Sequence, residues 1–147
     1  MTGRRIVVAS WVSVGIFFVF ATIDTAGVDA FDVPAAVVSL VLFLVSLPVW
    51  LYALGLSFVR NARGDDIAIP TLFLFIRGSA PSDVRWHLLG ALAVSVVIAI
   101  ATGFANPFGW LVPMLTLGLA GLWGARHGVY PRRREVSGAA RARGARP

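Results

Sequence analysis

The chain alternates between long apolar runs and short clusters of charged residues. Four runs contain no Asp, Glu, Lys or Arg and together make up about two thirds of the sequence: 6–23, 33–59, 67–76 and 86–125. An α-helix rises about 1.5 Å per residue, so roughly 20 apolar residues cross the hydrocarbon core of a bilayer. Apolar runs of this length predict membrane-spanning helices.

The first two long runs each predict one crossing. Residues 6–23 are just long enough for a single helix. Residues 34–59 exceed what one crossing needs, so that helix must tilt, kink at Pro48 or begin in the membrane interface.

The last run is too long for one crossing and predicts a helical hairpin. The dipeptide Asn106-Pro107 is typical of a turn. It divides the run into two arms, 87–105 and 108–125, and each arm is close to one bilayer thickness.

The remaining run, 67–76, is too short to cross as a helix and contains Pro70. We expect it to be interfacial or re-entrant. The predicted fold class is therefore all-α, a polytopic membrane protein with a four-transmembrane-helix bundle over residues 1–130. Residues 131–147 predict a disordered, arginine-rich tail.

The charged residues predict the orientation of this bundle. All 13 basic residues are arginines, and four crossings place every one of them on the same side, whereas the other side receives Asp24, Asp29 and Asp32. Cytoplasmic loops near membrane ends are enriched in Arg and Lys. We therefore expect a multi-pass protein of the cell (inner) membrane with N and C termini cytoplasmic, and with Trp86 and Trp123 near the inner boundary.

Composition narrows the class of protein. Hydrophobic residues make up 58% of the chain and charged residues 14%, well below the roughly 25% charged residues of a soluble domain. This excludes a soluble enzyme and a nucleic-acid-binding domain. Cysteine is absent, which excludes disulfides and thiolate chemistry. The use of Arg in place of Lys is typical of a GC-rich coding sequence and suggests an actinobacterium.

The first helix has an alternative interpretation. Arg4 and Arg5 before an apolar run also fit a secretory signal peptide, with a cleavage site near residues 28–30. The apolar core over 6–23 exceeds the usual length of about 7 to 15 residues, so a retained helix is favoured. Cleavage would leave three helices with the same orientation.

Small residues recur on one face of each arm of the hairpin. A spacing of four keeps such residues on the same side of a helix, where they let another backbone approach closely. Packing of the third helix on the fourth within one chain is the simplest use, and packing against another subunit is the alternative. The predicted helix-packing residues are Ala91, Ser95, Ala99, Gly103, Thr116, Ala120 and Gly124.

The basic cluster after the last helix predicts contact with anionic lipid headgroups, which attract each arginine near the surface by about 1 kcal/mol. Nucleic acid is the less favoured partner, because the membrane tether keeps these charges beside lipid. The predicted lipid-contact residues are Arg126, Arg132, Arg133 and Arg134.

Catalytic chemistry is not indicated. The predicted spans carry no ionisable residue at their centres, as proton coupling or charge relay would normally require. His87 and His127 are expected at the same depth in the interface, with metal or haem ligation as the less favoured alternative. Asp65 and Asp66 predict local pairing with arginine rather than a metal site, and Ser82 or Asp83 is expected to cap the third helix. No catalytic residue, metal or cofactor is predicted.

The second half of the chain, roughly residues 72–131, resembles a family of small, uncharacterised actinobacterial integral membrane proteins. The resemblance rests on RGSAP at 77–81, VRWHLLG at 84–90, NPFG at 106–109 and GLWGARHG at 121–128. It implies a membrane protein of that lineage and carries over no catalytic residue.

The functional hypothesis from the sequence is a non-enzymatic integral membrane protein, an accessory or scaffold component that packs through small-residue helix faces and forms homo- or hetero-oligomers. The alternative is a small oligomeric transporter or lipid-handling membrane protein. An enzyme acting on a lipid headgroup, with Asp65, Asp66 and His87, comes third.

Overall fold

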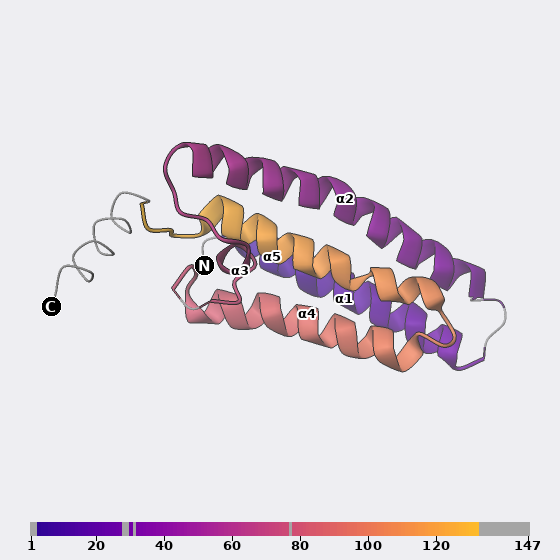
Figure 1. Cartoon of the computed structure of the whole chain (residues 1–147). Helices are drawn as coiled ribbons and strands as arrows, with labels where there is room; N and C mark the ends of the chain where they lie inside the picture. The colour runs from indigo at the N-terminus through magenta and orange to yellow at the C-terminus, as the bar shows by residue number, and fades with distance from the viewer. Residues whose placement is uncertain (1–2, 28–29, 31, 77, 133–147) are drawn as a thin grey trace, which may run out of the picture.

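The protein is a bundle of four long helices in the computed structural model, which describes residues 3–27, 30, 32–76 and 78–132 (Figure 1). Four segments are long and apolar enough to cross a membrane. They are α1 (Arg4–Thr25), α2 (Asp32–Ala62), α4 (Ser82–Thr102) and the span made by the 3-10 helix η2 (Pro107–Leu111) with α5 (Pro113–His127). The described residues contain no β-strand. The prediction of an all-α, four-span membrane fold is confirmed.

The two ends of the bundle differ in charge. α1 begins, α2 ends, α4 begins and α5 ends at the same end of the molecule, on the left in Figure 1. This end carries every arginine among the described residues and is called the arginine end below. The turns α1–α2 and α4–η2 form the opposite end, called the far end. The arginines concerned are Arg4, Arg5, Arg60, Arg63, Arg85, Arg126 and Arg132.

The helices do not begin and end where the apolar runs do. The third span begins at Ser82 rather than at residue 87 and ends at Thr102 rather than 105. Polar residues at its start can remain helical above the hydrocarbon, so the apolar run marks the membrane and not the helix. The fourth span is not one α-helix over 108–125, because η2 occupies its beginning and α5 starts only at Pro113, a residue suited to the first helical position.

The second helix is longer than its apolar run. α2 has 31 residues and continues through Pro48, which corresponds to a length of about 46 Å. The hydrocarbon core is only about 30 Å thick. α2 is thus longer than one crossing needs, and its last turn carries Arg60.

The central helix of the bundle is α5, which packs most extensively against α2 and also contacts α1 and α4. Its glycines permit close approach. A Cβ at Gly118 would lie 2.7 Å from Cδ1 of Trp50 on α2. The indole Nε1 of Trp50 donates a hydrogen bond to the carbonyl of Met114 at 2.8 Å, which ties the two helices together.

The segment 67–76, expected to be interfacial or re-entrant, folds into the arginine end of the bundle. It contains the single-turn helix α3 (Ile69–Leu72), and the side chains of Leu72, Phe73 and Leu74 are buried. The Phe73 ring lies 4.9 Å from the Trp50 ring between centroids. Arg85 of α4 donates from Nε to the Leu74 carbonyl at 3.0 Å. The segment is thus an internal packing element of this end.

Candidate functional site

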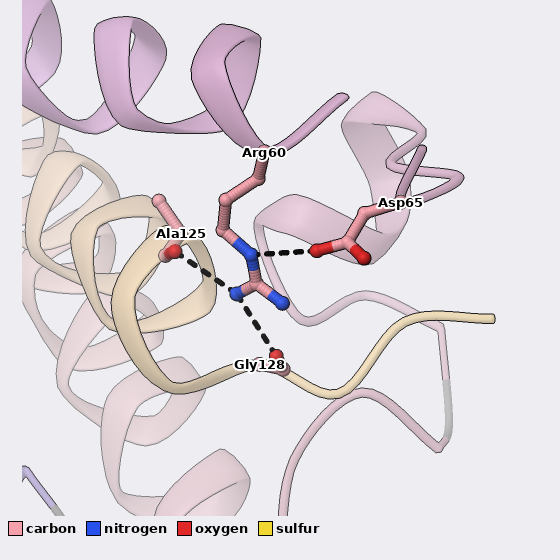
Figure 2. Close-up of polar contacts among 4 residues, drawn as sticks. All are labelled: Arg60, Asp65, Ala125 and Gly128. Carbon is pink, nitrogen blue, oxygen red and sulfur yellow. Dashed lines mark hydrogen bonds and ion pairs between the residues drawn. The ribbon is translucent and has the colours of Figure 1, made fainter. Parts of the chain in front are cut away.

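Arg60 organises the polar contacts of the arginine end (Figure 2). It comes from the last turn of α2, and its Nε donates to Oδ2 of Asp65 at 2.8 Å in an ion pair. Its Nη1 donates to the carbonyl oxygens of Ala125 at 3.1 Å and Gly128 at 3.0 Å. Local pairing of arginine with aspartate in this loop was predicted and is confirmed.

The two carbonyl contacts have a simple physical cause. The last carbonyls of an α-helix lack intrahelical partners, and the C-terminal end of the helix dipole attracts positive charge. α5 ends at His127, so the Ala125 carbonyl belongs to its last turn and the Gly128 carbonyl follows it. One guanidinium therefore caps α5 and joins it to α2.

The residues after α5 are fastened to this end by backbone hydrogen bonds. The Asp66 amide donates to the Pro131 carbonyl at 2.9 Å, and the Val129 amide donates to the Ser79 carbonyl at 3.1 Å. Asp65 and Arg132 also form an isolated antiparallel bridge. The segment 128–132 consequently has a fixed course across the arginine end.

Tyr130 is the buried aromatic residue of this segment, with a side chain only 9% exposed. The Arg60 guanidinium carbon lies 5.0 Å from the centroid of its ring, in cation–π geometry. Its hydroxyl has no hydrogen-bond partner among the described residues. Burial raises the pKa of Tyr130 to about 12, although the neighbouring Arg60 charge opposes part of that rise.

A groove of about 520 Å³ lies beside Arg60, between the ends of α2 and α5. It combines four arginines with one carboxylate, and that carboxylate already binds Arg60. Its lining also continues onto apolar side chains of α2. The lining residues are Tyr52, Leu56, Arg60, Arg63, Asp65, Ala125, Arg126, Gly128 and Arg132.

The predicted lipid-contact residues fall into two groups. Arg126 and Arg132 are exposed and line the groove. Arg133 and Arg134 lie outside the described residues. Contact of these arginines with lipid stays a prediction. The sequence argument missed Arg63 and Arg60 as members of the same groove.

All seven predicted helix-packing residues are buried. The hydroxyls of Ser95 on α4 and Thr116 on α5 lie 3.0 Å apart and share a hydrogen bond. Ala91 and Ala99 belong to a core cluster with Phe17 of α1. The α4 residues of the set therefore face two helices, α5 and α1.

The two glycines of this set approach different parts of the chain, Gly103 the fourth span and Gly124 the segment 67–76. A Cβ on Gly103 would lie 2.3 Å from the Trp110 indole nitrogen, and one on Gly124 would lie 2.0 Å from the Leu72 carbonyl oxygen. Ala120 packs in a cluster that includes Trp123 and Leu74. The small-residue face of α5 thus accommodates the segment 67–76 as well as α4.

The two histidines lie in different surroundings. His87 is exposed on α4, whereas His127 is partly buried with its ring 5.6 Å from that of Trp123.

The expected cap of α4 was wrong: the N-cap is Pro81, and no side chain caps the helix. Asp83 instead lies in the first turn, where a negative charge is favourable to the helix dipole.

Potential metal-ligating side chains are dispersed over the described part of the chain. Within the described residues, no group of three His, Asp or Glu side chains is close enough to hold a metal ion. The Asp65 carboxylate is engaged by Arg60, as Figure 2 shows. The chemistry that this end offers is the binding of negative charge by guanidinium groups.

Comparisons with protein-family models, curated proteins and solved structures found no match to this chain. The resemblance to the actinobacterial membrane-protein family therefore stays a prediction from the sequence motifs.

Proposed function

We propose that the protein is a non-enzymatic integral membrane component, an accessory or scaffold subunit of the cell membrane. The observation that carries this proposal is that polar side chains of the bundle bond to one another or to their own helix. Ser95 and Thr116 bond to each other, and Nδ2 of Asn106 donates to the Ser39 hydroxyl at 3.1 Å. Ser57 donates to a carbonyl of its own helix. The Ser95–Thr116 and Asn106–Ser39 contacts join different segments of the bundle, and the Ser57 hydroxyl bonds within α2, so in the proposed role these groups serve packing.

The partner-binding faces in this proposal lie on α1 and α2, because the small-residue faces of α4 and α5 are occupied within the chain. Gly15 on α1 and Gly55 on α2 are exposed, and a Cβ built on either meets nothing within 4 Å. Exposed glycines on apolar helices permit close approach of another helix in lipid. The partner is a transmembrane helix of another protein or of a second copy.

The proposed orientation places the arginine end in the cytoplasm. Its support is the separation of charge, with all described arginines at one end and Asp24 and Asp32 near the other. The same end is proposed to contact anionic headgroups through its exposed arginines.

Cross-linking in native membranes, followed by purification in mild detergent and mass spectrometry, tests the scaffold proposal. We expect one reproducible cross-linked partner, with a yield that falls when Gly55→Leu adds bulk to the outer face of α2. Val97→Leu on the exposed side of α4 is the matched control and should leave the yield unchanged. A monomer with no reproducible partner would contradict the proposal.

A lipid-handling role is the second candidate, and one observation favours it. The groove at the arginine end continues onto Tyr52 of α2, which is 56% exposed. Scrambling of fluorescent lipids in proteoliposomes tests this role. Faster scrambling than in protein-free vesicles would support it, and equal rates would exclude it.

A further inference from the structure

We propose that the groove between the ends of α2 and α5 binds one anionic phospholipid, whose phosphate is held by Arg63, Arg126 and Arg132. This site rests on the proposed placement of the arginine end at the headgroup layer. It differs from a diffuse attraction between a basic surface and a membrane, because it has a defined position and holds one lipid molecule.

The first argument is the unbalanced charge of the groove. The four arginines of its lining face a single carboxylate, Asp65, which accepts a hydrogen bond from Arg60. Among the described residues, Arg63, Arg126 and Arg132 have no side-chain hydrogen bond and no ion pair. Three guanidinium groups are therefore available to a phosphate, which arginine binds through paired N–H donors.

The second argument is the fixed geometry of the groove. Arg60 joins the end of α2 to the end of α5 through Ala125 and Gly128. The Asp65–Arg132 bridge fixes the backbone of Arg132 beside them. The backbones that carry the free arginines are thus held before a ligand arrives, which lowers the entropic cost of binding.

The third argument identifies the ligand as a lipid rather than a free anion. Tyr52, Leu56 and Arg60 follow one another at intervals of four, so they share one face of α2. This face changes from apolar to charged where the helix leaves its apolar run. A phospholipid has the same order of groups, with acyl chains beside Tyr52 and Leu56 and a phosphate beside the arginines. The volume of about 520 Å³ is within the usual range of about 300–1,000 Å³ for ligand pockets.

Native mass spectrometry of the full chain in detergent, with added phosphatidylglycerol or phosphatidylcholine, tests the site. We expect one tightly bound phosphatidylglycerol per protein and much weaker binding of phosphatidylcholine. The double variant Arg63→Gln/Arg132→Gln should raise the Kd for phosphatidylglycerol about 30-fold, equivalent to about 2 kcal/mol for two arginines. Arg60 stays unchanged in this test because it also holds the helices together.

The matched control removes the same charge elsewhere at this end. Arg4→Gln/Arg5→Gln, at the start of α1 and outside the groove, should change the Kd less than about threefold. Equal losses in the two double variants would show diffuse attraction and overturn the site. Inorganic phosphate and glycerol phosphate are added as soluble competitors of phosphatidylglycerol. Displacement of phosphatidylglycerol by either at equal concentration would show a soluble-anion site and overturn the lipid assignment.

These outcomes are distinguishable from failure of the proposed function. Loss of the cross-linked partner without loss of lipid binding would remove the scaffold role and keep the site. Equal lipid binding by the groove and control variants would remove the site and leave the cross-linked partner unaffected.

Discussion

A single side chain, Arg60, joins the end of α2 to the end of α5. Its guanidinium donates to one carboxylate and two carbonyls, and its side chain is 23% exposed. A hydrogen bond from a charged group contributes about 1.5–3 kcal/mol when its partners are shielded from water. Arg60 therefore stabilises the contact between α2 and α5 and is not simply a charge on the surface.

Replacement of Arg60 by glutamine should destabilise the bundle by about 2–3 kcal/mol, because the Ala125 and Gly128 carbonyls and the Asp65 carboxylate lose their donor. Unfolding in detergent micelles followed by circular dichroism measures this change. Arg63→Gln, directly after the end of α2, is the control, and we expect it to change the stability by less than about 0.5 kcal/mol. Equal stability of the two variants would refute the capping role of Arg60.

Tyr130 provides a prediction about pH. Its folded-state pKa of about 12 exceeds the ordinary value of about 10. Its contribution to stability is therefore complete below about pH 10 and is lost as pH rises from about 10 to about 12. In a Tyr52→Phe background, Tyr130 is the only tyrosine. Ultraviolet absorbance of the folded protein should then show phenolate formation with a midpoint near 12, whereas a midpoint near 10 would contradict the burial.

At the residue scale, sequence reasoning found short-range contacts and missed long-range ones. Arg60 and Asp65 are only five residues apart, so opposite charges close together in sequence were enough to predict the ion pair. Its carbonyl acceptors are 65 and 68 residues away and leave no pattern in side-chain type. Trp123 was expected at the membrane boundary and is only 1% exposed, because side chains of α1 and α4 and Leu74 of the segment 67–76 pack around it.

At the scale of an element, the segment 67–76 was also predicted only in part. Its length and proline correctly predicted that it does not span as a helix, yet its burial depends on glycines of α5. A Cβ on Gly121 would lie 2.5 Å from the Phe73 ring. Leu74 adopts a φ of 63°, a backbone conformation that residues other than glycine rarely adopt. Composition alone does not distinguish such insertion from an interfacial position.

Gly124→Ala should destabilise the protein by about 1–3 kcal/mol, because the new methyl group would collide with the Leu72 carbonyl and displace the segment 67–76. Gly55→Ala adds the same methyl group to an open face of α2 and should leave stability unchanged or slightly higher. Denaturant titration of both variants in micelles makes the comparison. A neutral Gly124→Ala would show that the segment does not pack there.

The contact between α4 and α5 can be tested at Ser95. Ser95→Ala removes one hydroxyl and should cost about 0.6 kcal/mol, a typical value for a hydrogen bond between membrane helices. Ser95→Leu should cost more, about 1–3 kcal/mol or above, because the site is fully buried. Val97→Leu, on the exposed side of the same helix, should have little effect. Similar stability for all three would argue against close packing of α4 on α5.

At the scale of the whole molecule, the number of spans could be predicted from the sequence, because the thickness of the hydrocarbon layer determines it. Charge-free runs identified four spans, since lipid excludes charge over a fixed thickness. Helix ends and the arrangement of helices around α5 depend on side-chain contacts between distant residues, which hydropathy does not encode. The groove at the arginine end is such an arrangement, because its residues come from α2, the connection that follows α2, α5 and the segment 128–132.

The proposed topology has four spans, with the arginine end in the cytoplasm. The chain has no cysteine, so single cysteines can be introduced against a clean background. Ala26 and Ala105 are exposed at the far end, and Ala62 and Val129 are exposed at the arginine end. A membrane-impermeant maleimide applied to spheroplasts should label Ala26→Cys and Ala105→Cys directly, and should label Ala62→Cys and Val129→Cys only after permeabilisation. The reverse pattern, or labelling of both ends from outside, would contradict the account.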